Sequence, residues 1–361
     1  MNELGTFREK VREIDKEIIN LIWQRIEITK KIGEKKKKKS IPLRNWELEK
    51  SIIENATTIA KNLGISQSLI KSIMQQLIME SVIQQERLHY SAYNGYKENI
   101  LIIGGLGEMG EWFSYFFQNQ GHNVSIYDIK GESTIFKSFK KLSNGIKKAS
   151  CVLIASSLNS VPEIIDELTQ LNFKGIIFDI ASLKGHLLDS IKRANEKGIK
   201  ITSIHPMFSS NVRTLTDKVI CFCDCGNQEA NKKVMLLFKN TAASIVELSL
   251  QEHDRLISYV LGLSHIINII FIKVLMEGNY KYIDLKNVAS TTFNSQMVTA
   301  ISVINENPDL YYAIQRFNPF NENLYKQLKE VVESITLYVL KGNKDIFFEV
   351  MEEGKKWLEE V

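Results

Sequence analysis

The stretch NILIIGGLGEMGEWFSYFF, at residues 99–117, is the feature that most constrains the fold. An apolar run typical of a buried strand leads into a glycine-rich turn, and a stretch typical of an amphipathic helix follows. The turn has the spacing G-x-G-x-x-G. In this setting the first glycine permits a tight turn, the second lets the backbone approach a pyrophosphate, and the third allows close packing of helix on strand. The pyrophosphate would lie at the helix N-terminus. The stretch therefore predicts a doubly wound α/β domain that binds a dinucleotide.

The second predicted strand ends in an acidic residue that bears on the choice of cofactor. Asp128 lies 23 residues after the first glycine of the turn. A carboxylate there hydrogen-bonds the ribose 2′-hydroxyl and repels a 2′-phosphate, which favours NAD, while Lys130 leaves NADP open. The alternative is a similar turn that binds some other ligand. The residues expected to contact the cofactor are Gly105, Leu106, Gly107, Glu108, Met109, Gly110, Asp128 and Ser156.

The first ninety residues have the pattern of a helical bundle. Glycine and proline are rare in them, and apolar residues recur at helical spacing. This pattern predicts three helices, at about residues 4–38, 45–62 and 66–90, with Ser66 as the N-cap of the third. We expect residues 1–90 to form an all-α domain.

The rest of the chain divides into a linker and two regions with different sequence patterns. Residues 91–98 are polar and typical of a linker. Within residues 99–248 six short apolar runs alternate with helical or polar stretches, which predicts a Rossmann-type α/β domain with a parallel sheet. Residues 249–361 carry long amphipathic runs without a strand signal, so we expect an all-α C-terminal domain. The predicted fold class is therefore a multidomain chain of three parts.

Composition excludes several other classes of protein. The 361 residues are 44% hydrophobic and 24% charged, which suits buried cores and is unlike disordered or collagen-like chains. No signal-peptide pattern is visible at the N-terminus. Of the four cysteines, Cys221, Cys223 and Cys225 alternate along one predicted strand without the spacing of a metal site. These features predict buried thiols, no metal and a cytoplasmic location.

Two sequence features bear on nucleic acids and membranes as partners. Residues 1–97 carry 18 Lys/Arg against 12 Asp/Glu, and Lys35–Lys39 is a run of five lysines. No aromatic interleaving accompanies the run, so a solvated helix end is a better interpretation than a nucleic-acid or membrane tether. Tyr259–Met276 is long and apolar, but three polar residues interrupt it, which favours a buried interface helix over a membrane span. We expect neither partner.

Two polar motifs follow later predicted strands, where the ligands of open α/β sheets bind. One is DIASLK at residues 179–184, and the other is HPMF at residues 205–208. A histidine at the carboxyl end of a strand, fixed by a following proline and beside the expected nicotinamide, is suited to acid/base work. A purely structural role for His205 is the alternative.

With these motifs the chain resembles the prephenate dehydrogenases. GGLGEMG, DIASLK, HPMF and two short histidine motifs, EHD and SH, occur in the family's order across roughly residues 99–340. The resemblance implies NAD-dependent oxidative decarboxylation of prephenate to 4-hydroxyphenylpyruvate and CO2. It implies that His205 accepts the proton of the ring 4-hydroxyl, that Ser182 hydrogen-bonds this hydroxyl and His205, and that His265 lines the substrate pocket. A neutral imidazole is a suitable base near pH 7.

Three positions depart from the pattern of that family. The arginine that binds a prephenate carboxylate would fall near Asn294, the second histidine of an S-H-x-x-H pattern is Asn268, and a frequent glycine is Ser209. If no cation binds the ring carboxylate, arogenate is the alternative substrate. The cationic residues that could replace the arginine are Arg213, Arg316 and Lys184.

An apolar row in the first predicted helix is interrupted by a charge. The row consists of Phe7, Val11, Ile14, Ile18, Leu21, Ile28 and Ile32. Arg25 occupies one of its positions and should need an anionic partner, and Lys36 lies near the same face. Glu49 begins a stripe on the second helix, and Ser81 and Gln85 lie on an apolar face of the third. Inward polar groups from three helices are typical of a small-molecule site, although a bundle with specificity-setting polar positions is the alternative.

This constellation resembles the all-helical chorismate mutases, across residues 4–88. The resemblance implies a Claisen rearrangement of chorismate to prephenate, which needs a dianion held in its reactive conformer and no proton transfer. The arginines would bind carboxylates, Lys36 and Gln85 would donate to the ether oxygen, and Glu49 would hold the hydroxyl. The implied site residues are Arg8, contributed by a partner chain, and Arg25, Lys36, Glu49, Ser81 and Gln85.

The two resemblances connect, because the first reaction makes prephenate and the second uses it. We therefore expect one polypeptide that catalyses two consecutive steps toward tyrosine, as a homodimer, since both families dimerise through helices. Leu48 stands where mutases commonly have an arginine, and Arg44 is a candidate substitute. The rival hypothesis is an arogenate dehydrogenase with a non-catalytic, regulatory or dimerising mutase-like domain.

Overall fold

The computed structural model describes residues 3–38, 46–90, 97–212, 215, 217–239 and 241–360. Contacts along the chain divide it into two units. The first consists of Met1–Ser182 with Leu187–Ser249, and the second of Leu183–His186 with Leu250–Val361. Each unit is considered by itself.

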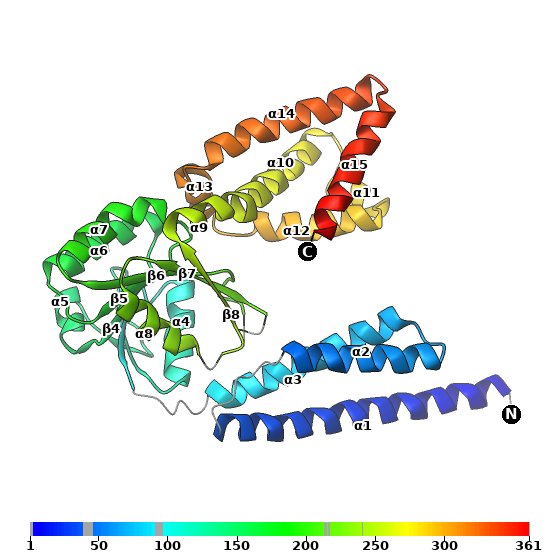
Figure 1. The fold of residues 1–361 in the computed structure, drawn as a ribbon, viewed down its shortest axis with the longest axis horizontal. Coiled ribbons are helices and arrows are strands. Elements are labelled where there is room, and N and C mark those ends of the chain that lie inside the picture. The colour runs from blue at the N-terminus through cyan, green and yellow to red at the C-terminus, as the bar shows by residue number, and fades with distance from the viewer. Residues whose placement is uncertain are drawn as a thin grey trace. The chain divides into compact units, whose positions relative to one another are not determined.

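The first unit begins with three helices, as the sequence predicted (Figure 1). They are α1 (Glu3–Lys38), α2 (Trp46–Asn62) and α3 (Gln67–Tyr90), and α3 packs against both others. Ser66 Oγ accepts a hydrogen bond from the Leu69 amide at 3.3 Å, which confirms the predicted N-cap.

The predicted apolar row of α1 is not a core within one chain. Every residue from Glu3 to Leu21 is exposed, and so are Ile28 and Ile32. The prediction that this row packs in a core was wrong. Within a single chain, the other helices of the bundle cover only the C-terminal half of α1, and there they cover positions outside the row. The row is left as an exposed apolar stripe.

An eight-stranded sheet follows in the order β3-β2-β1-β4-β5-β6-β7-β8. Neighbouring strands are parallel, except that β6 and β7 are antiparallel. The strands are β1 (Asn99–Ile103), β2 (Asn123–Tyr127), β3 (Lys137–Ser138), β4 (Cys151–Ile154), β5 (Ile176–Asp179), β6 (Lys200–Pro206), β7 (Val219–Asp224) and β8 (Ser244–Ser249).

The six predicted strands are confirmed, but the sheet differs from the prediction in three ways. The prediction missed β3, which has only two residues, and β8, whose side chains are mostly exposed and give no continuous apolar signal. It also made the whole sheet parallel. The described residues between β6 and β7 contain no helix, and a parallel connection normally requires such a crossover, so β7 runs in the opposite direction.

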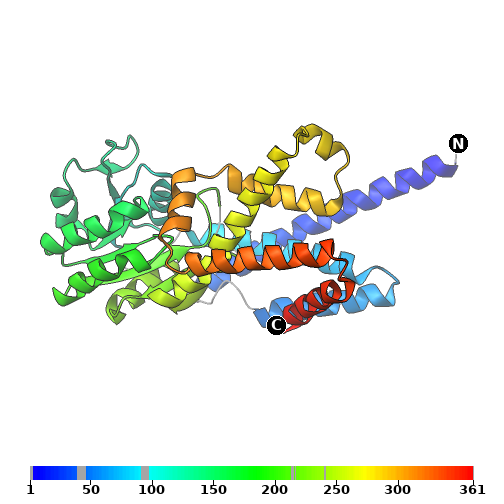
Figure 2. The same cartoon turned by 90° about the horizontal axis from the view of Figure 1, so that it is seen from above.

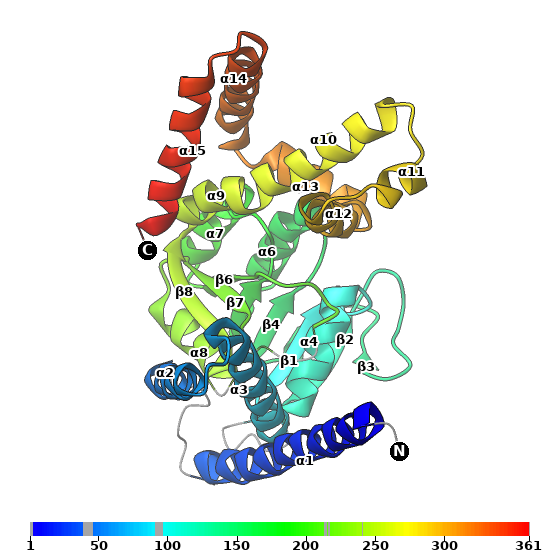
Figure 3. The same cartoon turned by 90° about the vertical axis from the view of Figure 1, so that its right-hand side faces the viewer.

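Helices cover both faces of the sheet (Figures 1 and 3). On one face α4 (Glu108–Asn119) and α8 (Gln228–Phe238) pack a large aromatic cluster, which includes Phe113, Phe117 and Phe238, onto the strands. On the other face lie α6 (Val161–Gln170) and α7 (Leu188–Glu196), while α5 (Leu142–Gly145) is a single turn. Helix α4 follows the glycine-rich turn directly, so this packing fixes the turn to the sheet.

The second unit is helical, as predicted. Helices α14 and α15 run side by side in it (Figure 2), and a π-helical segment separates α9 from α10. The stretch Leu250–Glu277 is long and apolar enough to cross a membrane by length and composition, yet it contains buried polar residues such as His253, His265 and Asn268. The elements are α9 (Leu250–Ile257), the π-segment (Ser258–Leu263), α10 (Ser264–Glu277), α11 (Tyr282–Asn287), α12 (Thr291–Ile304), α13 (Pro308–Phe317), α14 (Asn321–Leu340) and α15 (Lys344–Glu359).

Candidate active sites

The N-terminal helices gather polar groups around Arg25. From α1, the half-buried Arg25 donates through Nη1 to the carbonyl oxygen of Leu77 at 2.7 Å and to Oγ of Ser81 at 2.6 Å. Ser81 is buried on α3 and donates to the same carbonyl at 2.7 Å. Burial lowers the pKa of the Arg25 guanidinium. These partners are neutral, whereas the sequence argument expected an anion, so an anionic ligand would supply the missing charge.

Gln85 reaches the same region from the next turn of α3. Its side chain is buried against Gly33 of α1, where an added Cβ would lie 2.7 Å from Gln85 Cγ. Gln85 Oε1 is buried without a hydrogen-bond partner among the residues that the structure describes. Since rotation of an amide exchanges its oxygen and nitrogen, Gln85 can offer a ligand either an acceptor or a donor.

A cation and a carboxylate complete this group. Lys36 of α1 and Glu49 of α2 are half-buried; burial lowers the pKa of Lys36, and the smaller effect of the Glu49 carboxylate raises it. Three helices thus bring five of the six predicted positions together. Arg8 lies on the exposed N-terminal part of α1, Leu48 is 55% exposed, and Arg44 is outside the described residues.

The glycine-rich turn is shaped by close approaches at three glycines. Gly104, which precedes the G-x-G-x-x-G spacing, takes the left-handed conformation with φ of 82°, and an added Cβ there would lie 2.4 Å from the Ala155 carbonyl oxygen. At Gly105 a Cβ would lie 2.6 Å from the side chain of Ile126, and at Gly110 it would lie 2.1 Å from the Gly104 carbonyl oxygen. The N-terminus of α4 therefore sits tightly on the strand ends, as a pyrophosphate cradle requires.

Asp128 fixes the other side of this cradle. Its Oδ2 accepts from the Leu106 amide at 2.9 Å, and its Oδ1 accepts from the Lys130 amide at 2.9 Å. Ser156 follows β4 and hydrogen-bonds Ser160. The turn, the helix N-terminus and the Asp128 carboxylate therefore lie together, which fits a dinucleotide.

His205 lies at the carboxyl end of β6. It is 5% exposed and pairs with Cys221 of antiparallel β7. Because β5 and β6 are parallel, the half-buried Ser182, which follows β5, belongs to the same edge of the sheet. A buried imidazole and a hydroxyl at that edge are suited to proton transfer.

Of the three cationic residues that could replace the missing carboxylate-binding arginine, the structure describes two, and their surroundings differ. Lys184, in the second unit, is fully enclosed, and its amide donates to Oδ1 of Asp254 at 2.8 Å. The same carboxylate accepts from the Gly185 amide through Oδ2 at 2.6 Å. Asp254 therefore fixes the backbone of this segment, and the enclosed Lys184 is suited to a structural role. Arg316 is exposed on α13, whereas Arg213 is outside the described residues.

In the second unit, His265 is part of a buried neutral cluster. Its ring stacks on Tyr311 with centroids 4.1 Å apart, and burial lowers its pKa to about 4. One turn on, Asn268 donates to the Ser264 carbonyl oxygen at 2.7 Å and accepts from Gln296 Nε2 at 2.9 Å. The contacts of Tyr311 with His265 and of Gln296 with Asn268 were not predicted from the sequence, because each joins residues far apart in the chain.

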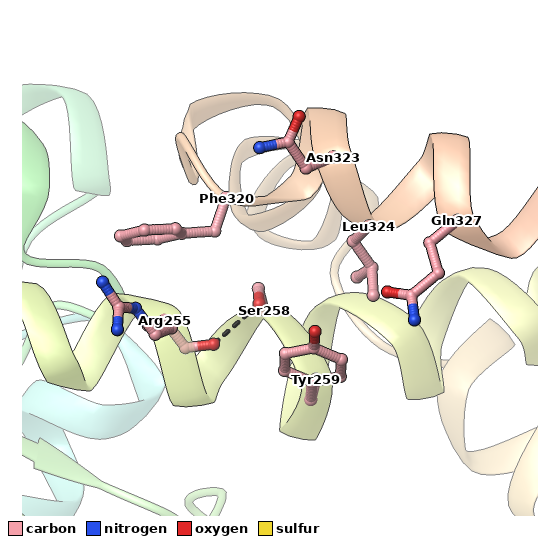
Figure 4. A pocket seen from close by; sticks show the side chains of 7 residues that line it. All are labelled: Arg255, Ser258, Tyr259, Phe320, Asn323, Leu324 and Gln327. Carbon is pink, nitrogen blue, oxygen red and sulfur yellow. Dashed lines mark hydrogen bonds between the residues drawn. The ribbon is translucent and has the colours of Figure 1, made fainter.

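A pocket of about 280 Å³ lies on the surface of the same unit (Figure 4). The guanidinium of Arg255 lies 5.5 Å from the centre of the Phe320 ring at one end of it. None of the predicted site residues lines this pocket. Its lining residues are Arg255, Ser258, Tyr259, Phe320, Asn323, Leu324 and Gln327.

The described residues contain no group of three or more His, Cys, Asp or Glu placed to hold a metal ion. The four cysteines, all of them described, are buried and form no disulfide, and burial raises the pKa of Cys151 to about 11. Thiols of this kind are unreactive.

Comparison with known families gives the class of protein that these sites define. Residues 7–87 match chorismate mutase type II, residues 117–247 match the nucleotide-binding domain of prephenate dehydrogenase, and residues 249–353 match the dimerization domain of prephenate dehydrogenase. The chain belongs to the proteins that join a type II chorismate mutase to a prephenate dehydrogenase.

Individual relatives have the same layout. The chain is 22% identical over 355 residues to the T-protein of Enterobacter agglomerans, covering 98% of this chain and 93% of the relative. It is 20% identical over 358 residues to the T-protein of Haemophilus influenzae, covering 99% and 93%. The structure of prephenate dehydrogenase from A. aeolicus, in complex with hydroxyphenyl propionate and NAD+, matches 74% of this chain and 99% of its own, with a TM-score of 0.62 at 18% identity. That similarity establishes the fold.

Proposed function

We propose that this protein is a bifunctional enzyme of tyrosine biosynthesis, which converts chorismate to prephenate and then prephenate to 4-hydroxyphenylpyruvate. The observation that carries the proposal is the union, in one chain, of a mutase domain and both dehydrogenase domains, with relatives that match over almost the full length. The arogenate alternative with a non-catalytic mutase domain is less favoured, because the described mutase site keeps two of its cations, Arg25 and Lys36, its carboxylate and both polar residues of α3.

In the mutase site, the residues of the chain bind and orient a dianion. Arg25 is held by neutral acceptors, so its charge is available to a carboxylate, and its fork can bind two oxygens at once. Lys36 and Gln85 are suited to donate to the ether oxygen as charge develops on it, and Glu49 to accept from the hydroxyl. No proton changes place in a Claisen rearrangement, so positioning and electrostatics provide the catalysis.

In the dehydrogenase site, the turn of residues 104–110 and Asp128 would hold NAD+, which accepts the hydride when bound. A carboxylate fixed beside the turn repels a 2′-phosphate, so NAD+ is preferred to NADP+. His205 accepts the proton of the substrate 4-hydroxyl, and Ser182 orients that hydroxyl. Loss of CO2 with formation of an aromatic ring drives the reaction forward.

Two exposed apolar surfaces support a homodimer. The stripe of α1 is exposed along its whole length, and the C-terminal unit, which matches a dimerization domain, exposes apolar residues of α10 and α15 such as Val274 and Trp357. Exposed surfaces of this extent are covered in oligomers. A partner packed on α1 would bring Arg8 to the neighbouring mutase site, and a helix interface accounts for the apolar α9–α10 stretch without a membrane.

Buried cysteines that form no disulfide and biosynthetic relatives support a cytoplasmic location. The proposed ligands are small molecules, and nucleic acids are not among them.

Separate assays of the two reactions test the proposal. Purified protein should consume chorismate without NAD+, and it should form NADH from prephenate and NAD+. Arogenate offered beside prephenate, with NAD+ and NADP+, measures the specificity. Absence of either reaction would overturn the bifunctional proposal.

A further inference from the structure

The segment that follows His205 is fastened to the cofactor helix by one side chain. The backbone of Met207 still pairs with the Val219 carbonyl oxygen of β7, at 2.9 Å. Beyond it, Trp112 of α4 donates from Nε1 to the Val212 carbonyl oxygen at 2.8 Å. The ring of Trp112 also contacts the ring of Phe208, with centroids 5.2 Å apart. Two different contacts of one residue therefore hold the segment at both ends.

Trp112 is itself firmly placed. Its ring stacks on Phe116 at 5.1 Å and meets Phe113 edge-on at 4.9 Å, both within the aromatic core under α4. A weaker second link joins the same two elements, because Ser210 Oγ donates to Glu108 Oε2 at 3.1 Å in the first turn of α4. The glycine-rich turn needs neither link, since Gly110 packs α4 directly onto it.

We propose that Trp112 is a positioning residue for the dehydrogenase reaction, an inference that rests on the proposed function of His205. It acts through the segment of residues 207–212: by tying this segment to α4, it sets where the end of β6, and with it His205, stands relative to the cofactor cradle. The indole N–H is the essential part, because a Phe at this position would keep the ring contacts and lose the tie to Val212.

Trp112→Phe tests this inference, with Tyr115→Phe, which removes a polar group from an exposed side chain of the same helix, as the matched control. The kcat for prephenate should fall about five-fold, which corresponds to about 1 kcal/mol for one hydrogen bond. The affinity for NAD+, measured by calorimetry, should stay within two-fold, because the cradle is fixed independently. The mutase rate of the same sample should not change.

A second measurement detects the hydrogen bond from Trp112 to Val212 without relying on catalysis. In protein labelled with ¹⁵N-tryptophan, the indole N–H that disappears in Trp112→Phe should be protected from hydrogen exchange. An unprotected Trp112 N–H, an unchanged kcat, a parallel loss of NAD+ affinity or an equal loss of both activities would each overturn the inference. A wild-type protein inactive on prephenate would instead contradict the proposed function, while the exchange measurement would still report the tie.

Discussion

Arg25 and Ser81 are joined across α1 and α3 by a hydrogen bond of 2.6 Å between Nη1 and Oγ. The bond orients the guanidinium without neutralising it, since Ser81 and the Leu77 carbonyl are both uncharged acceptors. A half-buried cation arranged in this way is suited to bind an anion that arrives from solution. The predictions for the mutase site follow from this arrangement.

Arg25→Ala should lower kcat/KM for chorismate by about 100- to 1,000-fold, the loss of about 3–4 kcal/mol expected when a charged contact to a dianion is removed. The dehydrogenase rate with prephenate should be unchanged. Chorismate disappearance without NAD+ measures the effect. Arg12→Ala, which removes an exposed arginine paired with Glu9 on the same helix, is the control and should change neither activity. A mutase that keeps most of its rate without Arg25 would refute this assignment.

Gly33→Ala should lower the mutase rate about ten-fold, because its Cβ would come within 2.7 Å of Gln85 Cγ and displace the amide. Combined with Gln85→Ala, the same change should cause little further loss, since the displaced group is already gone. A double-mutant cycle of mutase kcat measures the coupling. Simple additivity of the two effects would show that Gly33 does not act through Gln85.

His205→Asn should lower the rate of NADH formation from prephenate by about 100- to 10,000-fold, the range for loss of a general base. Asparagine is similar in size but accepts no proton at neutral pH. The mutase rate of the same sample serves as the control for folding. A dehydrogenase rate within ten-fold of wild type would exclude His205 as the proton acceptor.

Asp128→Asn should shift the cofactor preference toward NADP+ by about ten-fold, because the negative charge that repels a 2′-phosphate is removed. The amide oxygen of the new side chain can still accept from the Leu106 amide and hold the turn, whereas the bond from the Lys130 amide is lost. The ratio of kcat/KM for the two cofactors is the measurement. An unchanged ratio would mean that other groups set the preference.

His265 should make the stability of the second unit depend on pH. Burial lowers its folded-state pKa to about 4, whereas an unfolded chain has a histidine pKa near 6.5. The unfolded state therefore binds more protons between these values, so stability is full above about pH 6.5 and falls as the pH drops toward 4. The contribution lost from pH 7 to pH 5 should be about 2 kcal/mol.

Urea unfolding of wild type and His265→Gln at both pH values isolates this effect. The difference in the free energy of unfolding between pH 7 and pH 5 should be smaller in the variant by about 2 kcal/mol. Equal pH dependence in the two proteins would mean that His265 titrates normally.

Local patterns were enough to predict the three N-terminal helices and most of the strands, whereas the assignment of residues to the two sites stays a prediction. Helical periodicity and a serine cap defined α3, and the apolar runs defined six strands. The edge strand β8 was not predicted, because its side chains are mostly exposed and give no continuous apolar run. The direction of β7 depends on what connects it to β6, which an apolar pattern does not encode.

The details that sequence reasoning missed are contacts between distant residues. Gly104, outside the G-x-G-x-x-G spacing, takes the left-handed conformation, because the fold of the turn depends on how closely β1 approaches the end of β4. The stack of His265 on Tyr311 and the tie from Trp112 to Val212 each join separate elements. No local spacing predicts such pairs.

One coupled assay tests the proposed function most directly: purified protein is mixed with chorismate and NAD+, and NADH and 4-hydroxyphenylpyruvate are measured together over time. We expect both products to form in equal amounts, because prephenate made by the mutase site is consumed by the dehydrogenase site. No NADH from chorismate, and none when prephenate is supplied directly, would contradict the bifunctional assignment.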